Sequence, residues 1–549
     1  MKKSLFNILK KQNPARPQNS GYSHGSASST KRAFKGFTAR SYSPNQDINW
    51  NNYTMRQRGR IAYMSCPLGT SVIKSYRTNI VGTGLKVKPK INGALLGFSE
   101  QKTFELQQQI EREWRLWAED KRACDATGVN DFYGMQQLAL ISWLMSGDVF
   151  AVKKFYKETQ THPYSTRWHL IEADRIATPT NSGRPHLSWN MTDGVAENGN
   201  KIFDGVEVDK NGLVQAYYVC NHYPNEVSSD ATEYVRVAAL GDKTQLPNIL
   251  HLMNSERPDQ YRGVSIMAQV LEPLLQSKRY ADAELMAAVI ENYFTGFITS
   301  ENTTDIAINE VGSGNPNEPE VSTSENELEL GVGTFNYLKP GESITFADPK
   351  RPNSGFQPFM EAIANQIGGA TELPPEMIVK KFNSNYSASR AAFIEAWRAF
   401  KMIRSWFISD FCQPIYEAWL TEAVARGRIV APGFLDNPVA KQIYCQCDWI
   451  GPAMSQIDPL KEVQALEKAI DIGVLTRESA TMTYSGVDFF NNATQLKREN
   501  EALAAAKTPL IKAENGSNNS LFLDNGVQED DDSSNYSAPD DASDETSGE

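Results

Sequence analysis

Apolar side chains recur every three or four residues in three segments of the first 150 residues, and this spacing predicts helices. Pro67 suits the first turn of one helix and Gly82 its end, while Asp131 is the predicted N-cap of another. Trp114 and Trp117 share the apolar face of the remaining helix and are expected in the core. The three predicted helices are residues 67–82, 101–120 and 131–147.

A different pattern fills residues 148–250, where short β-branched and aromatic runs alternate with Gly, Asn and Pro. The strand-like runs are residues 149–156, 167–176, 205–219 and 234–240. Asp209 and Gly212 bound a sequence that is typical of a hairpin turn. One more strand is expected at residues 85–91, directly after a turn at Gly82. The first half of the chain is therefore predicted to be a mixed α+β domain.

The second half contains two longer segments with helical spacing, residues 264–294 and 388–425. At a rise of ~1.5 Å per residue, these helices would be roughly 45 Å and 57 Å long. A kink or break is expected at Pro273 in the first of them. The second helix is apolar enough to require neighbours, which its own chain or identical subunits could supply.

Shorter elements are expected between the two long helices. Residues 299–330 are polar and predict an exposed insertion, and two short strands joined at Pro340 are expected within residues 333–349. A short helix at residues 356–369 then precedes an irregular segment, residues 372–387.

The chain has 549 residues and a mass of 61.2 kDa, against ~100 to 200 residues for one domain, so several parts are expected. Its net charge of −11 is unevenly distributed. Residues 1–46 carry nine Lys or Arg and no acid, whereas residues 513–549 carry eleven acids and no Lys or Arg, which leaves −9 for residues 47–512. Both ends are predicted to be solvated tails, although the basic one could also be a nucleic-acid arm.

Residue types that often carry catalysis are present but scattered. Cys445 and Cys447 have no nearby His or second Cys pair to complete a zinc site, and six cysteines without a Cys-x-x-Cys pair fit a reducing compartment. The sequence has no phosphate-binding loop and no nucleophile elbow. Asp148, Glu172 and Asp174 are interpreted as turn and cap residues. We therefore expect no enzyme, no metal and no cofactor.

Membrane insertion is not expected either. No apolar run reaches the ~18 residues that span a bilayer, and the basic N-terminus has too short an apolar run for a convincing signal peptide. The sequence therefore predicts synthesis in the cytoplasm.

An ordered series of motifs gives the chain a family resemblance. The most specific are Arg257-Pro-x-Gln-x-Arg-Gly263, Leu338-x-Pro-Gly-Glu342 and Asn385-Tyr-Ser-x-x-Arg390. In this order, within roughly residues 50–505, the series resembles the lambda-type family of bacteriophage portal proteins. The chain departs from that family at Glu372-Leu-Pro-Pro-Glu376, where the family often has Gly-x-Pro-Tyr-Glu.

The resemblance implies an α+β, portal-type ring subunit with a mixed α/β wing, long stem helices, a small β-containing clip and a helical crown. It implies a ring of identical subunits, usually twelve, at the portal vertex of the capsid, through which double-stranded DNA enters during packaging and leaves during ejection. The implied partners are the terminase large subunit, the major capsid or scaffolding protein, and a head completion or tail connector protein. The protein would be made in the host bacterial cytoplasm and act in the virion, without a membrane.

The family's regions can be transferred in chain order. They are a basic arm at 1–46, the wing at 47–259 and 390–454, stem helices at 260–296 and 355–370, the clip at 297–354, the tunnel loop at 371–389, the crown at 455–505 and an acidic tail at 513–549. The crown has local support, since Asp458 and Pro459 suit a helix start, Gly473 a stop and Thr476 a second cap.

Two sets of residues are functional candidates under this resemblance. The expected DNA contacts in the channel are Lys380, Lys381, Asn383 and Asn385, with ordinary solvated charges as the alternative for the two lysines. The residues expected at a subunit interface or in a structural role are Arg257, Arg262, Asn385, Tyr386 and Arg390. For Arg257 and Arg262 both roles stay open, because a guanidinium can equally anchor a turn by bonding carboxylates or carbonyls. A core charge of −9 suits a channel along which DNA slides without tight phosphate neutralisation.

Two other classes of protein are weighed against this one. A packaging nuclease or ATPase would need a phosphate loop or a cluster of metal-binding carboxylates, and the sequence has neither. A monomeric scaffolding or DNA-binding assembly protein is supported only by the basic N-terminus. The mass of the native particle would separate a monomer from a ring.

Overall fold

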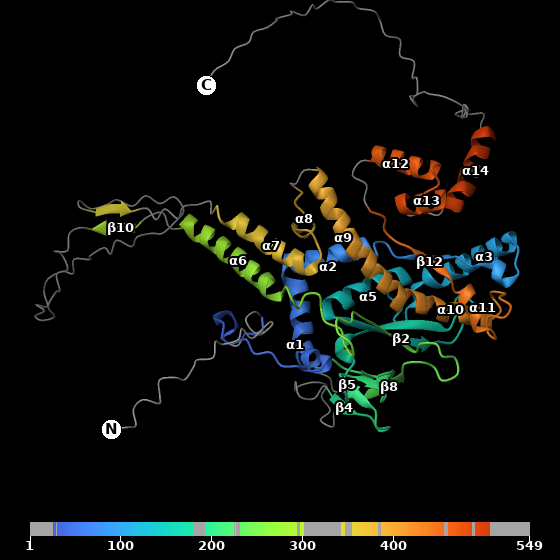
Figure 1. The fold of residues 1–549 in the computed structure, drawn as a ribbon, viewed down its shortest axis with the longest axis horizontal. Helices are drawn as coiled ribbons and strands as arrows, with labels where there is room; N and C mark the ends of the chain where they lie inside the picture. Colours follow the sequence, from blue (N-terminus) through green and yellow to red (C-terminus); the bar gives the residue numbers. More distant parts are fainter. Residues whose placement is uncertain are drawn as a thin grey trace, which may run out of the picture. The chain divides into compact units, whose positions relative to one another are not determined.

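The structure is a computed structural model that divides into two compact units, Met1–Asp488 and Phe489–Glu549, each considered by itself. The residues it describes are 26–28, 30–179, 193–223, 226, 231–293, 297–300, 342–345, 354–382, 386–454, 459–485 and 489–505. The described part of the second unit is one helix, α14 (Phe489–Ala505). All elements below belong to the first unit (Figure 1).

The helices begin and end where local sequence caps them. α1 (Pro44–Ser65) starts with a capping box between Ser43 and Gln46. α5 (Phe132–Ser146) starts with an Asp131 carboxylate that accepts from the Gly134 amide at 2.7 Å. The other helices are α2 (Pro67–Ile80), α3 (Glu100–Ala118), α4 (Lys121–Cys124), α6 (Leu271–Tyr293), α7 (Phe356–Thr371), α8 (Pro375–Val379), α9 (Tyr386–Phe407), α10 (Gln413–Ala425), α11 (Pro438–Tyr444), α12 (Pro459–Asp471) and α13 (Arg477–Ser485).

The strands pair antiparallel in a three-stranded sheet of order β3-β2-β9, a five-stranded sheet of order β4-β5-β6-β7-β8, and two separate pairs, β1-β12 and β10-β11. Their bounds are β1 (Lys86–Pro89), β2 (Asp148–Phe155), β3 (Thr166–Glu172), β4 (Asp193–Val195), β5 (Lys201–Phe203), β6 (Val206–Val208), β7 (Val214–Cys220), β8 (Tyr234–Ala238), β9 (Ile249–Met253), β10 (Phe297–Ser300), β11 (Glu342–Thr345) and β12 (Cys447–Ile450). The predicted hairpin between β6 and β7 is confirmed.

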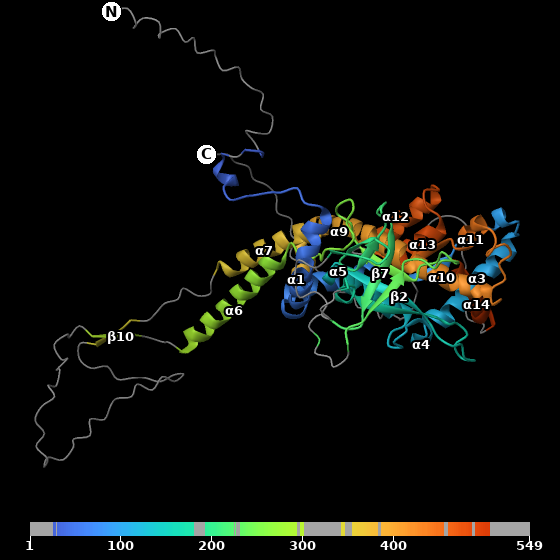
Figure 2. The same ribbon diagram turned by 90° about the horizontal axis from the view of Figure 1, so that it is seen from below.

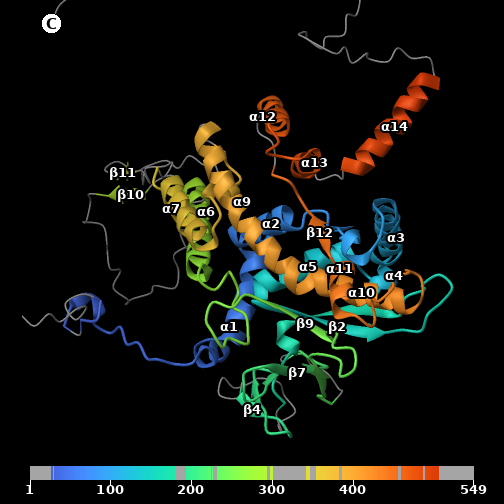
Figure 3. The ribbon, with the colours of Figure 1, turned by 45° about the vertical axis from the view of Figure 1, so that its right-hand side comes forward.

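The central strand β2 separates two hydrophobic cores because its side chains alternate between the faces of the sheet. Val149 and Ala151 belong to a core shared with the helices, and Trp114 and Trp117 are fully buried there, as predicted. Phe150, one residue along, belongs to a second core that is shared with the five-stranded sheet. Helices, three-stranded sheet and five-stranded sheet therefore form successive layers (Figure 3).

Most predicted helices are confirmed, including the long one. The helix predicted at 388–425 consists of α9, a π-helical turn at Ile408–Cys412 and α10. Gly473 has a φ of 75° after α12, and the Thr476 hydroxyl accepts from the Ser479 amide, so the predicted stop and second cap are confirmed. No helix among the described residues is long and apolar enough to cross a membrane.

The long helix predicted at 264–294 was wrong at its start. α6 begins at Leu271, because the preceding turns bond to α5 instead: the Ile266 amide and the Ser265 hydroxyl both donate to the carbonyl of Leu144. Pro273 is the third residue of α6, where its missing N–H removes no helical hydrogen bond, so the kink expected there is not needed.

Two further expectations needed correction, and a third is tested only in part. Helix α1 was not predicted, and it begins inside the region assigned to the basic arm. The segment expected to be irregular at 372–387 contains the short helix α8 and the first residues of α9. The strand at Glu342–Thr345 pairs with Phe297–Ser300, while the partner expected within 333–349 lies outside the described residues.

Helices α6 and α7 lie side by side in both views (Figure 1 and Figure 2). Tyr280 of α6 contacts two rings of α7, with centroids 5.5 Å from Phe356 and 4.6 Å from Phe359. α6 leads along the chain into β10, and β11 leads back into α7. The paired strands β10 and β11 thus belong to the connection between the two helices.

Candidate functional site

The motif at residues 257–263 forms a loop held by its own side chains. The side-chain Oε1 of Gln260 accepts from the backbone amides of Glu256 and Arg257 at 2.9 and 3.2 Å, and its Nε2 donates to the backbone carbonyl of Arg262 at 2.8 Å. Gly263 lies so close to Gly147 that a Cβ on Gly263 would collide with the Gly147 carbonyl. Gln260 and Gly263 of this motif therefore have structural roles: the first holds the loop, and the second allows the close approach to Gly147.

Arg262 is fully buried within its own chain. Its Nε lies 2.6 Å from Asp148 Oδ2 and its Nη1 lies 2.8 Å from Asp204 Oδ2. It also donates to the carbonyls of Ala173 and Ile176, at 2.9 and 3.1 Å. A guanidinium has five donors in a fixed fork, and this site offers acceptors on several sides. Of the two roles left open for Arg262, bonding to carboxylates and carbonyls is the one that the structure describes.

Arg56 brings a second buried cation to the same place from α1. Its Nε lies 3.0 Å from Asp174 Oδ1, and its other nitrogens lie 3.6 Å from Asp204 and 4.0 Å from Asp148. The Nε–H and Nη1–H bonds of Arg56 are not aligned as hydrogen bonds, so these contacts are ion pairs only. Arg60, one turn along, pairs with Asp174 and lies 3.0 Å from Glu172.

We call these side chains the ionic joint: Arg56, Arg60, Asp148, Asp174, Asp204 and Arg262. Three cations oppose three carboxylates, and they tie α1, β2, the turn before β6 and the loop before α6 together. Glu172 and Asp174 do lie at a turn, since Glu172 is the N-cap residue of the 3-10 turn Ala173–Arg175, but no side-chain cap bond forms there. The carboxylates of Asp148, Glu172 and Asp174 instead pair with arginines far away in sequence.

The charges of the ionic joint reinforce one another. Burial alone would raise the pKa of Asp148, but Arg262 and His251 stabilise its carboxylate and bring that pKa well below the usual range. Burial opposes the charge of Arg262, yet Asp148 and Asp204 raise its pKa. Burial lowers the pKa of His251, which Asp148 partly offsets. The geometry therefore favours a closed set of ion pairs at neutral pH.

The remaining interface candidates lie in different surroundings. Arg257 is exposed, with Nη1 2.5 Å from Asp47 Oδ2 and Nη2 donating to the Tyr42 carbonyl at 3.1 Å. Tyr386 is the first residue of α9, and Arg390 is half-buried one turn later. Asn383 and Asn385 lie outside the described residues.

The two candidate lysines differ in their contacts. Lys380 is the exposed residue that follows α8, with a φ of 60°, and its Nζ donates to the Ser75 hydroxyl of α2 at 2.7 Å. Burial lowers the pKa of Lys380. Lys381 is exposed, and its Nζ lies 3.8 Å from the exposed carboxylate of Glu361. An exposed pair at that distance contributes little, so Lys381 is the more available cation.

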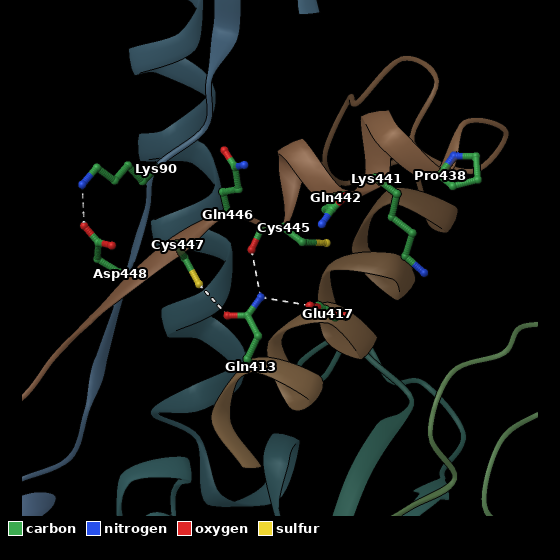
Figure 4. Close-up of a pocket in the computed structure, with 10 residues that line it drawn as sticks. All are labelled: Lys90, Gln413, Glu417, Pro438, Lys441, Gln442, Cys445, Gln446, Cys447 and Asp448. Atoms are coloured by element: carbon green, nitrogen blue, oxygen red, sulfur yellow. Dashed lines mark hydrogen bonds and ion pairs between the residues drawn. The ribbon is translucent and has the colours of Figure 1, made fainter. Parts of the chain in front are cut away.

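A polar cavity of about 730 Å³ lies beside α10, α11 and β12 (Figure 4). Its central side chain is Gln413, which donates to Glu417 and to the Cys445 carbonyl at 3.0 Å and accepts from Cys447 Sγ at 3.1 Å. Burial raises the pKa of Cys445 to about 12, so its thiol stays protonated and is a poor metal ligand. Among the described residues, no group of three His, Cys, Asp or Glu side chains could hold a metal.

Comparisons with known proteins place the chain in a family. A family model described as "Phage portal protein, lambda family" matches residues 30–404. Portal protein B of Escherichia phage lambda is 22% identical over 424 residues, which cover 74% of this chain and 76% of that protein. The portal protein of Escherichia phage N15 is 22% identical over 80% of this chain and 82% of its own length. The probable portal protein of Halomonas phage phiHAP-1 is 24% identical, covering 79% and 78%.

Similarity to solved structures is weaker. A chain from the "Neck of empty GTA particle computed with C6 symmetry" aligns over 80% of this chain and 94% of its own, with 14% identity and a TM-score of 0.41. One from the "Neck of native GTA particle computed with C12 symmetry" has the same coverage and identity and a TM-score of 0.38.

The family match covers well over half of the chain and defines the class: this is a structural protein of the phage virion and not an enzyme. The chain belongs to the lambda family of phage portal proteins, as its motifs predicted. Sequence reasoning found Arg262 through one of those motifs, but it missed Arg56, because the helix that carries it was not predicted.

Proposed function

We propose that this portal protein assembles into a closed ring of twelve subunits around an axial channel for double-stranded DNA. The observation that carries the proposal is the family match over residues 30–404. The paired helices α6 and α7, whose connection includes the two-stranded β10-β11 sheet, support it because they have the chain order of a stem and clip. In this proposal DNA enters through the channel during packaging and leaves through it during ejection.

The regions of the subunit follow from the same proposal. The wing contains residues 47–259 and 390–454, and therefore both large sheets and every member of the ionic joint except Arg262, which lies in the loop before α6. α6 and α7 are the stem within 260–296 and 355–370, and residues 297–354 are the clip. Residues 371–389 form the tunnel loop and 455–505 the crown, with a basic arm at 1–46 and an acidic tail at 513–549.

The proposal assigns partners by region. The clip would dock the terminase large subunit during packaging and a head completion or tail connector protein afterwards. The ring would assemble with the major capsid or scaffolding protein in the host bacterial cytoplasm and remain at the capsid vertex of the virion. Arg257, Tyr386 and Arg390 are proposed to lie near subunit boundaries, with Asn385 beside them.

Contact with DNA is proposed for the tunnel loop, through Lys381 together with Asn383 and Asn385. Lys381 supports this because it is exposed and its Nζ pairs only loosely, at 3.8 Å, with the exposed carboxylate of Glu361. Lys380 could join the contact only by leaving Ser75. A few ring-repeated lysines would touch the phosphates without the extensive neutralisation that makes binding tight.

The assembly is tested by light scattering of the purified chain and negative-stain imaging of the same sample. A closed ring with a central hole and a mass of roughly 700 kDa, about twelve times the chain mass, is expected. A chain that stays monomeric at high concentration and near-physiological salt would instead favour a monomeric scaffolding or DNA-binding assembly protein.

A further inference from the structure

One face of α2 donates hydroxyl hydrogen bonds to the backbone around α8. The Ser71 hydroxyl donates to the Ile378 carbonyl at 2.7 Å, and the Ser75 hydroxyl donates to the Met377 carbonyl at 3.4 Å. Tyr76 adds a bond to the carbonyl of Thr371, the last residue of α7. The last carbonyls of a helix have no partner within the helix. The face of α2 supplies partners to two such helix ends.

Lys380 completes the arrangement from the other side. It follows the last residue of α8, and its ammonium donates to Ser75, so Ser75 is bonded to both the carbonyl of Met377 and the side chain of Lys380. Ser75 is buried and has a small side chain, so Lys380 must reach across the α2–α8 contact to meet it. Lys380 as a whole is exposed, but its ammonium is engaged by the Ser75 hydroxyl.

The backbone of this segment is held in an uncommon conformation at both ends. Glu372, after α7, has a φ of 52°, and Lys380, after α8, has a φ of 60°. The left-handed region at a helix end is normally taken by glycine, because a side chain is unfavourable there. A segment with two such residues needs contacts from outside to keep one conformation. Helix α7 packs against α8, and α2 supplies the side-chain hydrogen bonds described above.

We propose that Ser71, Ser75 and Tyr76 of α2, together with Lys380, are positioning residues that fix the tunnel-loop segment 372–381 and thereby set where Lys381 stands. This inference rests on the proposed function for the meaning of that position. Lys380 then acts through Ser75 and not by touching DNA.

Amide hydrogen exchange of the full-length chain without DNA tests the anchoring. Ser75→Ala and Lys380→Met should each speed the exchange of residues 373–381 by about fivefold to tenfold, since each removes a tertiary hydrogen bond. The effects should be non-additive in the double variant, because both break the same contact. Thr70→Val is the control on α2, since its hydroxyl bonds to Tyr63 and Cys66. Lys381→Met is the control for loss of a positive charge in the same segment. Lys380→Arg keeps a cationic donor at position 380, so its exchange should stay as slow as in the parent chain.

The outcomes separate this inference from the proposed function. Unchanged exchange in Ser75→Ala and Lys380→Met, or effects that simply add, would overturn the anchoring even in a chain that forms rings. A monomer in which the two effects are coupled would keep the anchoring and overturn the ring.

The positioning of Lys381 is tested separately. A photo-crosslinking residue replaces Lys381, linear duplex DNA is added to the purified ring, and the yield of the DNA adduct is measured. Ser75→Ala should lower the yield of the DNA adduct while Thr70→Val leaves it unchanged. Equal yields in the two variants would overturn the positioning role. No adduct in the parent ring would overturn the DNA contact proposed for Lys381.

Discussion

The ionic joint and the α8 anchor hold neighbouring parts of one subunit with different chemistry. The α8 anchor comprises Ser71, Ser75, Tyr76 and Lys380. The joint neutralises buried guanidinium groups with buried carboxylates, whereas the anchor pairs hydroxyls with helix-end carbonyls beside an exposed loop. Removing one partner of a buried ion pair leaves a charge without compensation, but removing one hydroxyl loses a single modest bond.

The difference predicts how each region responds to stress. The ionic joint can open only by leaving several buried charges without partners at once, so it should open together with the sheets and helices around it. The anchor can open one bond at a time, which is the behaviour of regions that open locally at low free energy.

The largest expected effect is that of Arg262→Met. This change keeps most of the side chain's apolar volume and leaves the buried carboxylates of Asp148 and Asp204 without their Arg262 partner. The free energy of unfolding should fall by ~3–5 kcal/mol, measured as a lower urea midpoint with an unchanged slope. Arg257→Met is the matched control, because its ion pair with Asp47 is exposed and should contribute less than ~1 kcal/mol. Similar losses in the two variants would contradict a special role for the buried pairs.

The second prediction concerns acid. Because Arg262 and His251 lower the pKa of Asp148 despite its burial, the carboxylate adds stability above its ordinary pKa of ~3.9, and that stability is lost as pH falls below this value. Asp148→Asn should be less stable at pH 7 and should lose less additional stability between neutral pH and about pH 3. Unfolding midpoints measured across this range would show it. An equally steep acid dependence in Asp148→Asn would place the titrating group elsewhere.

The same two regions show how far the sequence could predict this molecule. Helices α2 and α5 were predictable because their caps and apolar faces are local features. α1 was not, because the face it buries includes Asn45, Asn49 and Arg56 and has no clear apolar periodicity. A buried polar face becomes favourable only through partners elsewhere in the chain.

The residues of the candidate site were also only partly predictable from the sequence. The motif at 257–263 identified Arg262 from the sequence, but its partner Asp148 is 114 residues away, and no local rule connects them. Lys380 was singled out as a charge on a loop, and its contact with Ser75, 305 residues away, changes the role proposed for it. Local patterns predict which residues are unusual, and packing decides what they do.

A smaller effect is expected from Tyr76→Phe in the α8 anchor. Burial raises the pKa of Tyr76, so its hydroxyl stays protonated and donates to the Thr371 carbonyl. Removing it should lower the free energy of unfolding by about 1–2 kcal/mol and speed amide exchange at the end of α7. Tyr133→Phe is a useful control, since Tyr133 also has a raised pKa, about 12, but is on α5. Faster exchange near Thr371 in both variants would argue against a local contact.

The smallest effect, and the one with an unusual sign, is expected from Glu372→Gly. Glu372 is exposed at the end of α7 in the left-handed region, so glycine should relieve strain there and stabilise the subunit by up to about 1 kcal/mol. Ala370→Gly, two residues earlier and also exposed, should instead destabilise it by about 1 kcal/mol, because it puts glycine inside a helix. The two variants place glycine on either side of the last residue of α7, so urea midpoints that move in opposite directions separate backbone strain from side-chain loss. Two downward shifts would mean that Glu372 stabilises its turn, and that the strain inferred for the α8 segment is confined to Lys380.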